Sequence, residues 1–169
     1  MSSELRFIVD NMLGSLARWL RILGYDAVYD KSADDWQIIR RAELERRIIV
    51  TKDRALHNKA LKHGLKSILL WEDEVHEKLA HVALVAGIRL SVDFSSTRCP
   101  EDNTPLVKVS KEKVKDKVPP GVYRVHEDFW ECPRCGKVYW VGRHWKKIEE
   151  ILKRAREHLE ELKSKTKTY

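Results

Sequence analysis

The chain has 169 residues, enough for one ordinary domain and a small attachment. Its net charge of +7 and pI of about 9.3 favour an anionic partner, of which nucleic acid is the commonest. No apolar run approaches the roughly 20 residues of a membrane span, and the N-terminus shows no signal-peptide pattern. We therefore expect a cytoplasmic protein that does not enter a membrane.

Short apolar runs alternate with helix signals through the first half of the chain. Strands are expected near residues 5–9, 26–30, 47–53 and 67–71. Helices are expected after each of them, beginning at Asn11, at Ser32 or Asp34, at Arg54 and near Glu72. Strands and helices that alternate over short connections predict βαβ units and a mainly parallel sheet flanked by helices. This α/β domain is assigned to residues 1–94.

The pattern changes after residue 94 to Cys, Pro and charged turns. Residues 95–143 predict a small antiparallel β unit, with strand candidates in "LVKV" (106–109) and "VYRV" (122–125). The stretch "SKEKVKDKVPPG" (110–121) is expected to be a charged loop. Residues 144–169 read as a basic helix and tail, so the sequence predicts three segments.

Acidic residues stand where strands of the parallel sheet end. Asp10 follows the first strand and Asp53 the third, while Asp35 lies in the first turn of the preceding helix. Ligands of such sheets bind beyond the carboxyl ends of the strands. Carboxylates that converge there repel one another unless cations join them, and Mg²⁺ or Mn²⁺ prefer such oxygen ligands. These three residues are therefore candidate metal ligands and catalytic residues.

An alternative function for each acid is to cap a helix, which is the expected role of Asp34. A fourth active-site acid stays open among Asp30, Glu72 and Asp73. Basic residues near the strand ends are candidate contacts for RNA phosphates, although on exposed helix faces they could equally be solvated charges. These residues are Arg18, Arg21, Lys52 and Arg54.

The second segment contains a metal-binding pattern. Cys132 and Cys135 form a CxxC followed by Gly136, and Cys99 begins what would be the first half of a zinc ribbon. A redox dithiol would normally open a helix after a strand, whereas "ECPRCGKVYW" reads as a hairpin turn. Asp102 stands at the fourth-ligand position. His126 or His144 as the fourth ligand, and a cysteine pair without metal, are alternatives.

Several stretches together resemble the Mut-seven C-terminal RNase family, in which a PIN-like nuclease domain precedes a zinc ribbon. They are "FIVDNMLGSLARWLRILGYD", "DWQI", "RRIIVTKDRAL", "RCP" and "CPRCGKVYWVGRHW", in the family's order from about Arg6 to Ile148. The resemblance implies metal-dependent cleavage of RNA, with the active-site acids at Asp10, Asp35 and Asp53. The chain departs from the family's C-P-x-C, because Asp102 replaces the second cysteine.

The sequence thus predicts a Mg²⁺- or Mn²⁺-dependent ribonuclease with a structural zinc ribbon. The alternative is a non-catalytic RNA-binding or assembly module on the same fold. A phosphoacceptor receiver domain would want an acidic pair after the first strand, and a phosphatase with an aspartyl nucleophile would want D-x-D. Both are disfavoured because Asp10 is followed by Asn11 and Met12. The sequence leaves open the RNA substrate, endo or exo cleavage, and the oligomeric state.

Overall fold

The structure is a computed structural model that describes residues 4–166. Its first domain is built on a parallel sheet with strand order β2-β1-β3-β4. The strands are β1 (Arg6–Val9), β2 (Asp26–Tyr29), β3 (Ile48–Thr51) and β4 (Ser67–Leu69). Each pair is parallel, so all four carboxyl ends lie at one edge of the sheet. This confirms the α/β fold predicted from the sequence.

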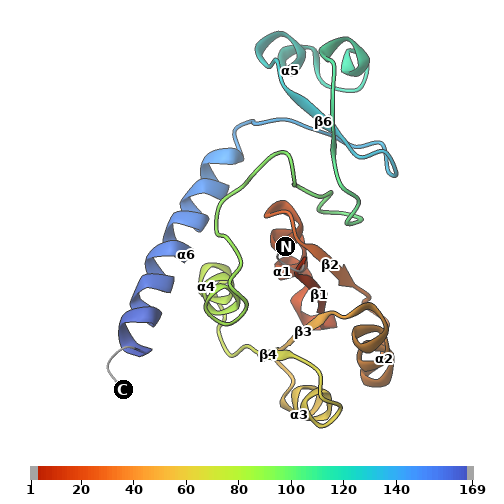
Figure 1. The fold of residues 1–169 in the computed structure, drawn as a ribbon. Coiled ribbons are helices and arrows are strands. Elements are labelled where there is room, and N and C mark those ends of the chain that lie inside the picture. The colour runs from red at the N-terminus through yellow and green to blue at the C-terminus, as the bar shows by residue number, and fades with distance from the viewer. Residues whose placement is uncertain (1–3, 167–169) are drawn as a thin grey trace.

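Helices cover both faces of this sheet (Figure 1). They are η1 (Asn11–Leu13), α1 (Gly14–Ile22), α2 (Asp35–Glu45), α3 (Arg54–Lys62) and α4 (Val75–Ala86). Alternate residues of β1 point to opposite faces: Phe7 joins the core formed with α1 and α4, and Ile8 joins the core formed with α2 and α3. The sheet is therefore buried on both sides, as its continuous apolar runs predict.

Helix termini follow local sequence signals. Asp34 caps α2, accepting from the N–H of Gln37, while the Gln37 side chain accepts in return from the N–H of Asp34. Asn11 does not cap the first helix as expected. Asp10 caps the short η1 helix instead, and α1 follows directly. One oxygen of the Asp10 carboxylate therefore accepts a hydrogen bond from the backbone N–H of Asn11.

The second segment contains a three-stranded antiparallel sheet of β5 (Val107–Val109), β6 (Phe129–Glu131) and β7 (Val138–Tyr139). The expected strand at 122–125 is wrong, because these residues lie in a helix, α5 (Pro120–Val125). Pro120 occupies the first helical position, where its missing N–H costs nothing. The expected charged loop includes a short helix, η2 (Lys111–Val114). Val114 and Val118 from this stretch form a small core with Phe129 of β6.

The C-terminal helix α6 (Trp145–Thr166) returns to the first domain and runs along α4 (Figure 1). Leu152 and Ala155 are completely buried and belong to the same core as Phe7. Arg156 donates a hydrogen bond of 2.7 Å to the carbonyl of Leu90. A helix that reads as mostly charged thus completes the core of the α/β domain through a narrow apolar stripe. Within residues 4–166, no helix combines the length and apolarity needed to cross a membrane.

Candidate functional site

Asp10 lies at the carboxyl end of β1 and is buried, with 6% of the residue exposed. Its Oδ1 accepts a 2.7 Å hydrogen bond from the N–H of Asn11, and its Oδ2 accepts one of 2.6 Å from the Thr51 hydroxyl. Among the described residues it has no ion-pair partner. A buried charge without a counter-charge is costly, so this carboxylate is placed to gain from a bound cation.

Asp53 is held beside Asp10 through the same threonine. Its N–H donates a 2.9 Å hydrogen bond to the Thr51 hydroxyl oxygen. Its Oδ1 caps α3 by accepting from the N–H groups of Ala55 at 2.8 Å and Leu56 at 3.4 Å. Its Oδ2 accepts no hydrogen bond within the part of the chain that the structure describes. Asp53 is exposed, and it therefore caps α3 with one carboxylate oxygen while the other stays available to a ligand.

Asp35 opens α2 and is turned toward α3. Its Oδ2 accepts a 3.2 Å hydrogen bond from the ammonium group of Lys59, which lies six residues after Asp53. Six residues advance a helix by about 9 Å. The ion pair thus gives Asp35 a partner from the second turn of α3.

The three carboxylates do not form a ready-made three-ligand site. Within residues 4–166, the only group of three or more potential ligands whose ligand atoms all lie within 4.8 Å of one another is in the second segment. Two oxygens on one Mg²⁺ lie at most about 4.2 Å apart, because each bond is about 2.1 Å long. Asp10, Asp35 and Asp53 therefore do not all bind one ion directly in this arrangement. Mg²⁺ commonly takes one or two carboxylates and keeps several waters, so a metal site at this edge would need only two of the three acids.

The candidate fourth acids each have another partner. Glu72 is buried, and its Oε2 lies 2.7 Å from Nδ1 of His81 on α4. Asp73 is exposed and accepts from the ammonium group of Lys52 at 3.2 Å. Asp30 accepts from both the N–H and the hydroxyl of Ser32, which lowers the pKa of this exposed carboxyl. None of the three is directed to Asp10 by a described contact.

The four basic residues that are candidate phosphate contacts differ in their exposure and in the partners they already have. Arg54 opens α3 beside Asp53, is exposed and has no ion-pair partner in the described range, whereas Lys52 is half-buried beside Asp73. Arg18 is paired with Glu101 at 2.5 Å. The expectation of an exposed helix face for Arg21 is wrong. Arg21 is buried and donates to the carbonyls of Ala27 and Pro100, both at 2.8 Å.

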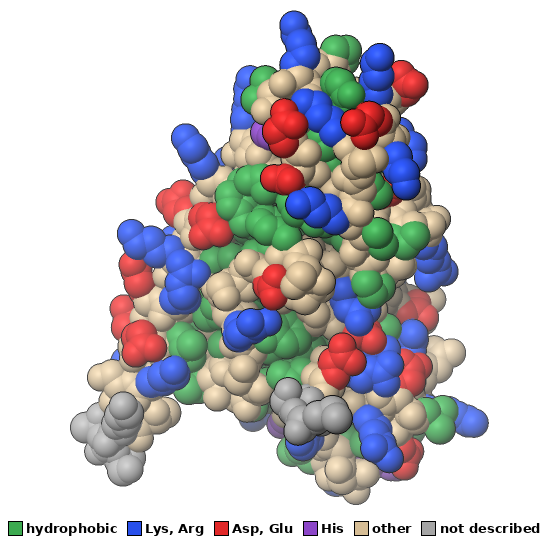
Figure 2. Space-filling model, turned by 45° about the horizontal axis from the view of Figure 1, so that its top comes forward, with side chains coloured by type: hydrophobic (Ala, Val, Ile, Leu, Met, Phe, Trp, Pro, Cys, Tyr) green, Lys and Arg blue, Asp and Glu red, His purple; other side chains and the backbone are tan. Residues whose placement is uncertain are grey.

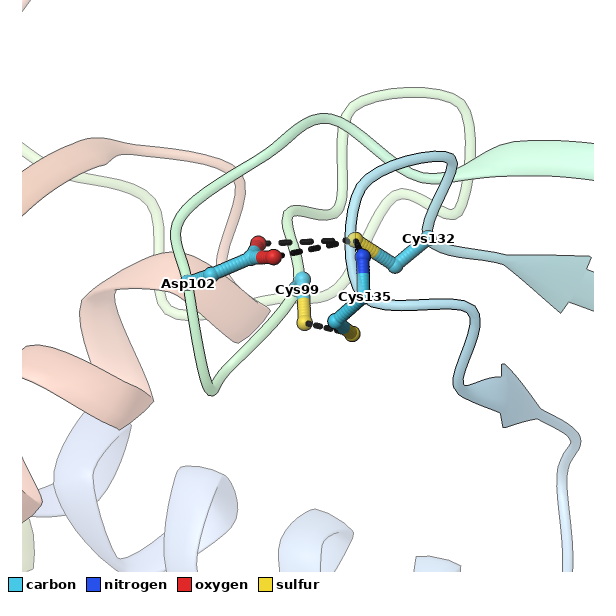
Figure 3. A group of neighbouring side chains, drawn as sticks. All are labelled: Cys99, Asp102, Cys132 and Cys135. Carbon is cyan, nitrogen blue, oxygen red and sulfur yellow. Dashed lines mark hydrogen bonds between the residues drawn. The ribbon is translucent and has the colours of Figure 1, made fainter.

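The second segment brings Cys99, Asp102, Cys132 and Cys135 together, and their side chains converge from two loops (Figure 3). The sulfurs of Cys99 and Cys135 lie 3.8 Å apart. The sulfur of Cys132 lies 3.4 and 3.3 Å from the two carboxylate oxygens of Asp102. These four side chains could hold a metal ion. Neither His126 nor His144 belongs to the group, so Asp102 takes the fourth position in the described structure.

Electrostatics within this group favour a cation. Burial alone would raise the pKa of Asp102, but hydrogen bonds from Thr104 and from the thiols of Cys132 and Cys99 lower it to about 2. The N–H of Lys137 lowers the pKa of the Cys135 thiol, yet burial and the neighbouring thiols raise it to about 11. The group therefore combines one firmly ionised carboxylate with a thiol that resists ionisation until a positive charge is present.

The second segment is attached to the first domain through Asn103. Its side-chain oxygen accepts from the N–H of Ala27 at 3.1 Å, and its amide donates to Asp26 at 2.7 Å. Asn103 has φ of 72°, a left-handed conformation that Asn tolerates better than most residues. Neither this contact nor the role of Thr51 is predicted by a sequence motif. The one feature of the sequence that could have indicated this role is that Thr51 carries a hydroxyl group and lies two positions before Asp53.

Comparison with known families supports a nuclease-type function. The family model described as Mut7-C RNAse domain matches residues 5–152, which include the α/β domain, the cysteine group and the beginning of α6. No curated protein and no solved structure matched the chain. The match spans most of the sequence, in agreement with the resemblance seen in its motifs. The chain belongs to the Mut7-C RNase domain family.

Proposed function

We propose that the protein is a metal-dependent ribonuclease whose centre is formed by Asp10 and Asp53. The observation that carries this proposal is the buried Asp10 carboxylate, which has no counter-charge among the described residues and shares the Thr51 hydroxyl with Asp53. Two acids held in this way at adjacent strand ends, in a chain of an RNase family, fit a cation site better than two independent helix caps.

The donor set suits a hard divalent ion. Carboxylate oxygens, together with the hydroxyl of Thr51 as an orienting group, match the preferences of Mg²⁺ or Mn²⁺. Such an ion, when bound, polarises a phosphodiester and activates water. Asp10 and Asp53 would hold it, and Asp35 would reach the centre once Lys59 releases it. A phosphate of the RNA is a natural partner for that freed ammonium group.

Positive groups next to the acids would position the RNA backbone. Arg54 is exposed beside Asp53, and the half-buried Lys52 is paired with the exposed Asp73. Exposed ion pairs contribute little to stability. A phosphate of the RNA could therefore replace Asp73 as the partner of Lys52 at a small cost in free energy. Arg18 would need to leave Glu101 in the same way. Arg21 is not proposed as a contact because its guanidinium group is used inside the protein.

A cleavage assay tests the proposal. Single-stranded RNA is incubated with Mn²⁺ and either the wild type or the double variant Asp10→Asn, Asp53→Asn. Asn remains a good N-cap, so α3 is retained. We expect cleavage to fall roughly 100-fold or more, because the lost charges remove several kcal/mol of transition-state stabilisation. Glu43→Gln, at an exposed acid of α2, is the matched control. Unchanged cleavage by the double variant would refute the proposal.

A second candidate is a non-catalytic RNA-binding module. The observation that favours it is the use of Asp53 as a helix cap and of Asp35 as the partner of Lys59, which are structural roles. This candidate predicts salt-sensitive RNA binding without cleavage in Mn²⁺. The assay above therefore separates the two functions.

We also propose that the cysteine group binds zinc in a structural role. In a tetrahedral site with zinc–sulfur bonds of about 2.3 Å, two sulfurs lie about 3.8 Å apart, which matches Cys99 and Cys135. A sulfur and an oxygen at about 2.3 and 2.0 Å from zinc lie about 3.5 Å apart, close to the Cys132–Asp102 distances. All four ligand positions are filled by protein, as in structural rather than catalytic zinc sites.

A further inference from the structure

A cavity of about 1010 Å³ lies where the small sheet, residues 92–97 and the beginning of α6 meet. It is at the upper end of the range for sites that bind small organic ligands. In the space-filling view, hydrophobic side chains gather in a hollow in the upper part of the molecule (Figure 2). Asp10, Asp35 and Asp53 do not line the cavity. It is therefore separate from the proposed cleavage centre.

Aromatic rings from three segments form much of its wall. Phe94 stacks on Trp130 of β6 with ring centroids 4.8 Å apart and contacts Trp145 of α6 at 5.0 Å. Tyr139 pairs with Trp130 across the sheet and lines the same space. Trp130, Trp145 and Tyr139 are each only partly buried. Ring surface thus remains for a flat, stackable ligand.

The charged side chains that line the cavity are basic, and one of them, Arg18, is paired with Glu101. Among the described residues that line it, none is Asp or Glu, while Arg18, Arg143, His126 and His144 contribute basic groups. Arg143 is exposed and has no ion-pair or hydrogen-bond partner within residues 4–166. An unpaired guanidinium at the edge of an aromatic wall fits an anionic ligand that also carries flat rings.

We propose that this cavity binds nucleobases of single-stranded RNA, with bases against Trp130 and Trp145 and a phosphate at Arg143. The inference rests on the proposed function and deepens it, because RNA held here would belong to the substrate beyond its cleaved bond. Aromatic platforms combined with a positive groove are how proteins bind single strands without sequence preference. An apolar peptide or a lipid chain would leave Arg143 without a counter-charge.

Helix α1 connects the cavity with the acids at the strand ends. It begins shortly after Asp10, and its residues Arg18 and Ile22 line the cavity. A helix of nine residues is about 14 Å long. A strand of RNA with its base in the cavity and its backbone along α1 would therefore reach the acids within a few nucleotides.

Binding is measured by fluorescence anisotropy with the full chain carrying Asp10→Asn and Asp53→Asn, in EDTA, so that no cleavage is required. The probes are a labelled single-stranded adenylate decamer and an abasic ribose-phosphate decamer of equal charge. In that background, Trp145→Leu is expected to weaken binding of the adenylate RNA roughly 5- to 150-fold, the usual effect of losing one stacking ring. Binding of the abasic probe should change less than twofold.

Arg143→Glu covers the case in which the tryptophan variant folds poorly, because this side chain is exposed. It should weaken both probes, and more than Arg154→Glu, a matched charge reversal on α6 outside the cavity lining. Equal affinity for the two probes, or no effect of Trp145→Leu and Arg143→Glu, would overturn the inference even if the protein cleaves RNA. A change from dimer to monomer in Trp145→Leu, measured by sedimentation, would assign the cavity to a second copy and also overturn it. Base-dependent binding by a protein without cleavage would support the inference and reject only the ribonuclease proposal.

Discussion

Thr51 and Asp10 are joined across neighbouring strands by a 2.6 Å hydrogen bond from the threonine hydroxyl to the carboxylate. The oxygen of that hydroxyl accepts from the N–H of Asp53 at 2.9 Å. One buried hydroxyl group thus links the Asp10 carboxylate to the backbone of Asp53, the two acids on which the proposed chemistry depends. Loss of a group that orients a metal ligand typically costs about 10- to 100-fold in metal affinity or activity.

Thr51→Val removes this hydroxyl while keeping a β-branched side chain of similar shape. We expect cleavage in Mn²⁺ to fall about 10- to 100-fold, because Asp10 loses its orienting donor. The free energy of unfolding should fall by about 1–3 kcal/mol, because polar groups near the sheet edge lose their partner. Thr51→Ser keeps the hydroxyl and should retain most of the cleavage rate. Equal rates for the valine and serine variants would argue against the orienting role.

Asp102→Cys would place a fourth thiol in the cysteine group, where the sequence departs from the C-P-x-C pattern. The variant should retain zinc through dialysis against a chelator that strips the wild type, because four thiolates bind zinc more firmly than three and a carboxylate. Asp102→Ala should lower zinc content, while Asp116→Ala, at an exposed acid of the same segment, should not. Metal content is measured by elemental analysis. Identical zinc retention in all four proteins would contradict a ligand role for Asp102.

Asp26 gives the fold a predictable dependence on pH. Burial alone would raise its pKa, but hydrogen bonds from Arg47 and Asn103 and the charges of Arg47 and Arg98 lower the pKa of Asp26 to about 2. A carboxyl whose folded pKa is depressed contributes stability above its unfolded pKa and loses it as the pH falls. The wild type should therefore lose on the order of 2 kcal/mol from this group between about pH 5 and pH 2.

Urea unfolding at several pH values tests this effect. Asp26→Asn should be less stable than the wild type at neutral pH and should show a shallower loss of stability below pH 5. Asp128→Asn, at an exposed acid of the second segment, should follow the wild-type curve. If Asp26→Asn lost stability below pH 5 as steeply as the wild type, Asp26 would not be the source of this pH dependence.

The packing of α6 on α4 predicts that the C-terminal helix is part of the folded α/β domain. Leu152→Ala removes a completely buried side chain and should lower the free energy of unfolding by about 2–5 kcal/mol. Lys153→Ala, one position further and exposed, should change it by less than about 0.5 kcal/mol. Thermal unfolding measured by circular dichroism separates these outcomes. Similar melting temperatures for the two variants would mean that α6 does not contribute to the core.

The α/β framework could be predicted because its signals are local. Continuous apolar runs mark the buried strands, and Asp34 with Gln37 forms a capping box that fixes the start of α2. The stretch 122–125 was misjudged because its β-branched residues favour a strand, while Pro120 in front of them favours the first turn of a helix. At that point a local start signal prevailed over residue propensity.

Contacts between distant segments could not be read from the sequence. Arg21 looked like part of an exposed basic face, but the second segment covers it and uses its guanidinium group through Pro100. Thr51 carries no motif that distinguishes it from any other strand residue. The pairing of Asp35 with Lys59 depends on how α2 and α3 lie beside each other. Each of these relationships arises from packing rather than from sequence periodicity.

The most direct test of the central claim is a crystal structure of the protein soaked in Mn²⁺, with the ion located by its anomalous signal. The proposal predicts a Mn²⁺ peak at the carboxyl ends of β1 and β3, bound by Asp10 and Asp53, that is lost in crystals of Asp10→Asn. A structure without Mn²⁺ at these two carboxylates, from protein that cleaves RNA under the same Mn²⁺ concentration, would contradict it.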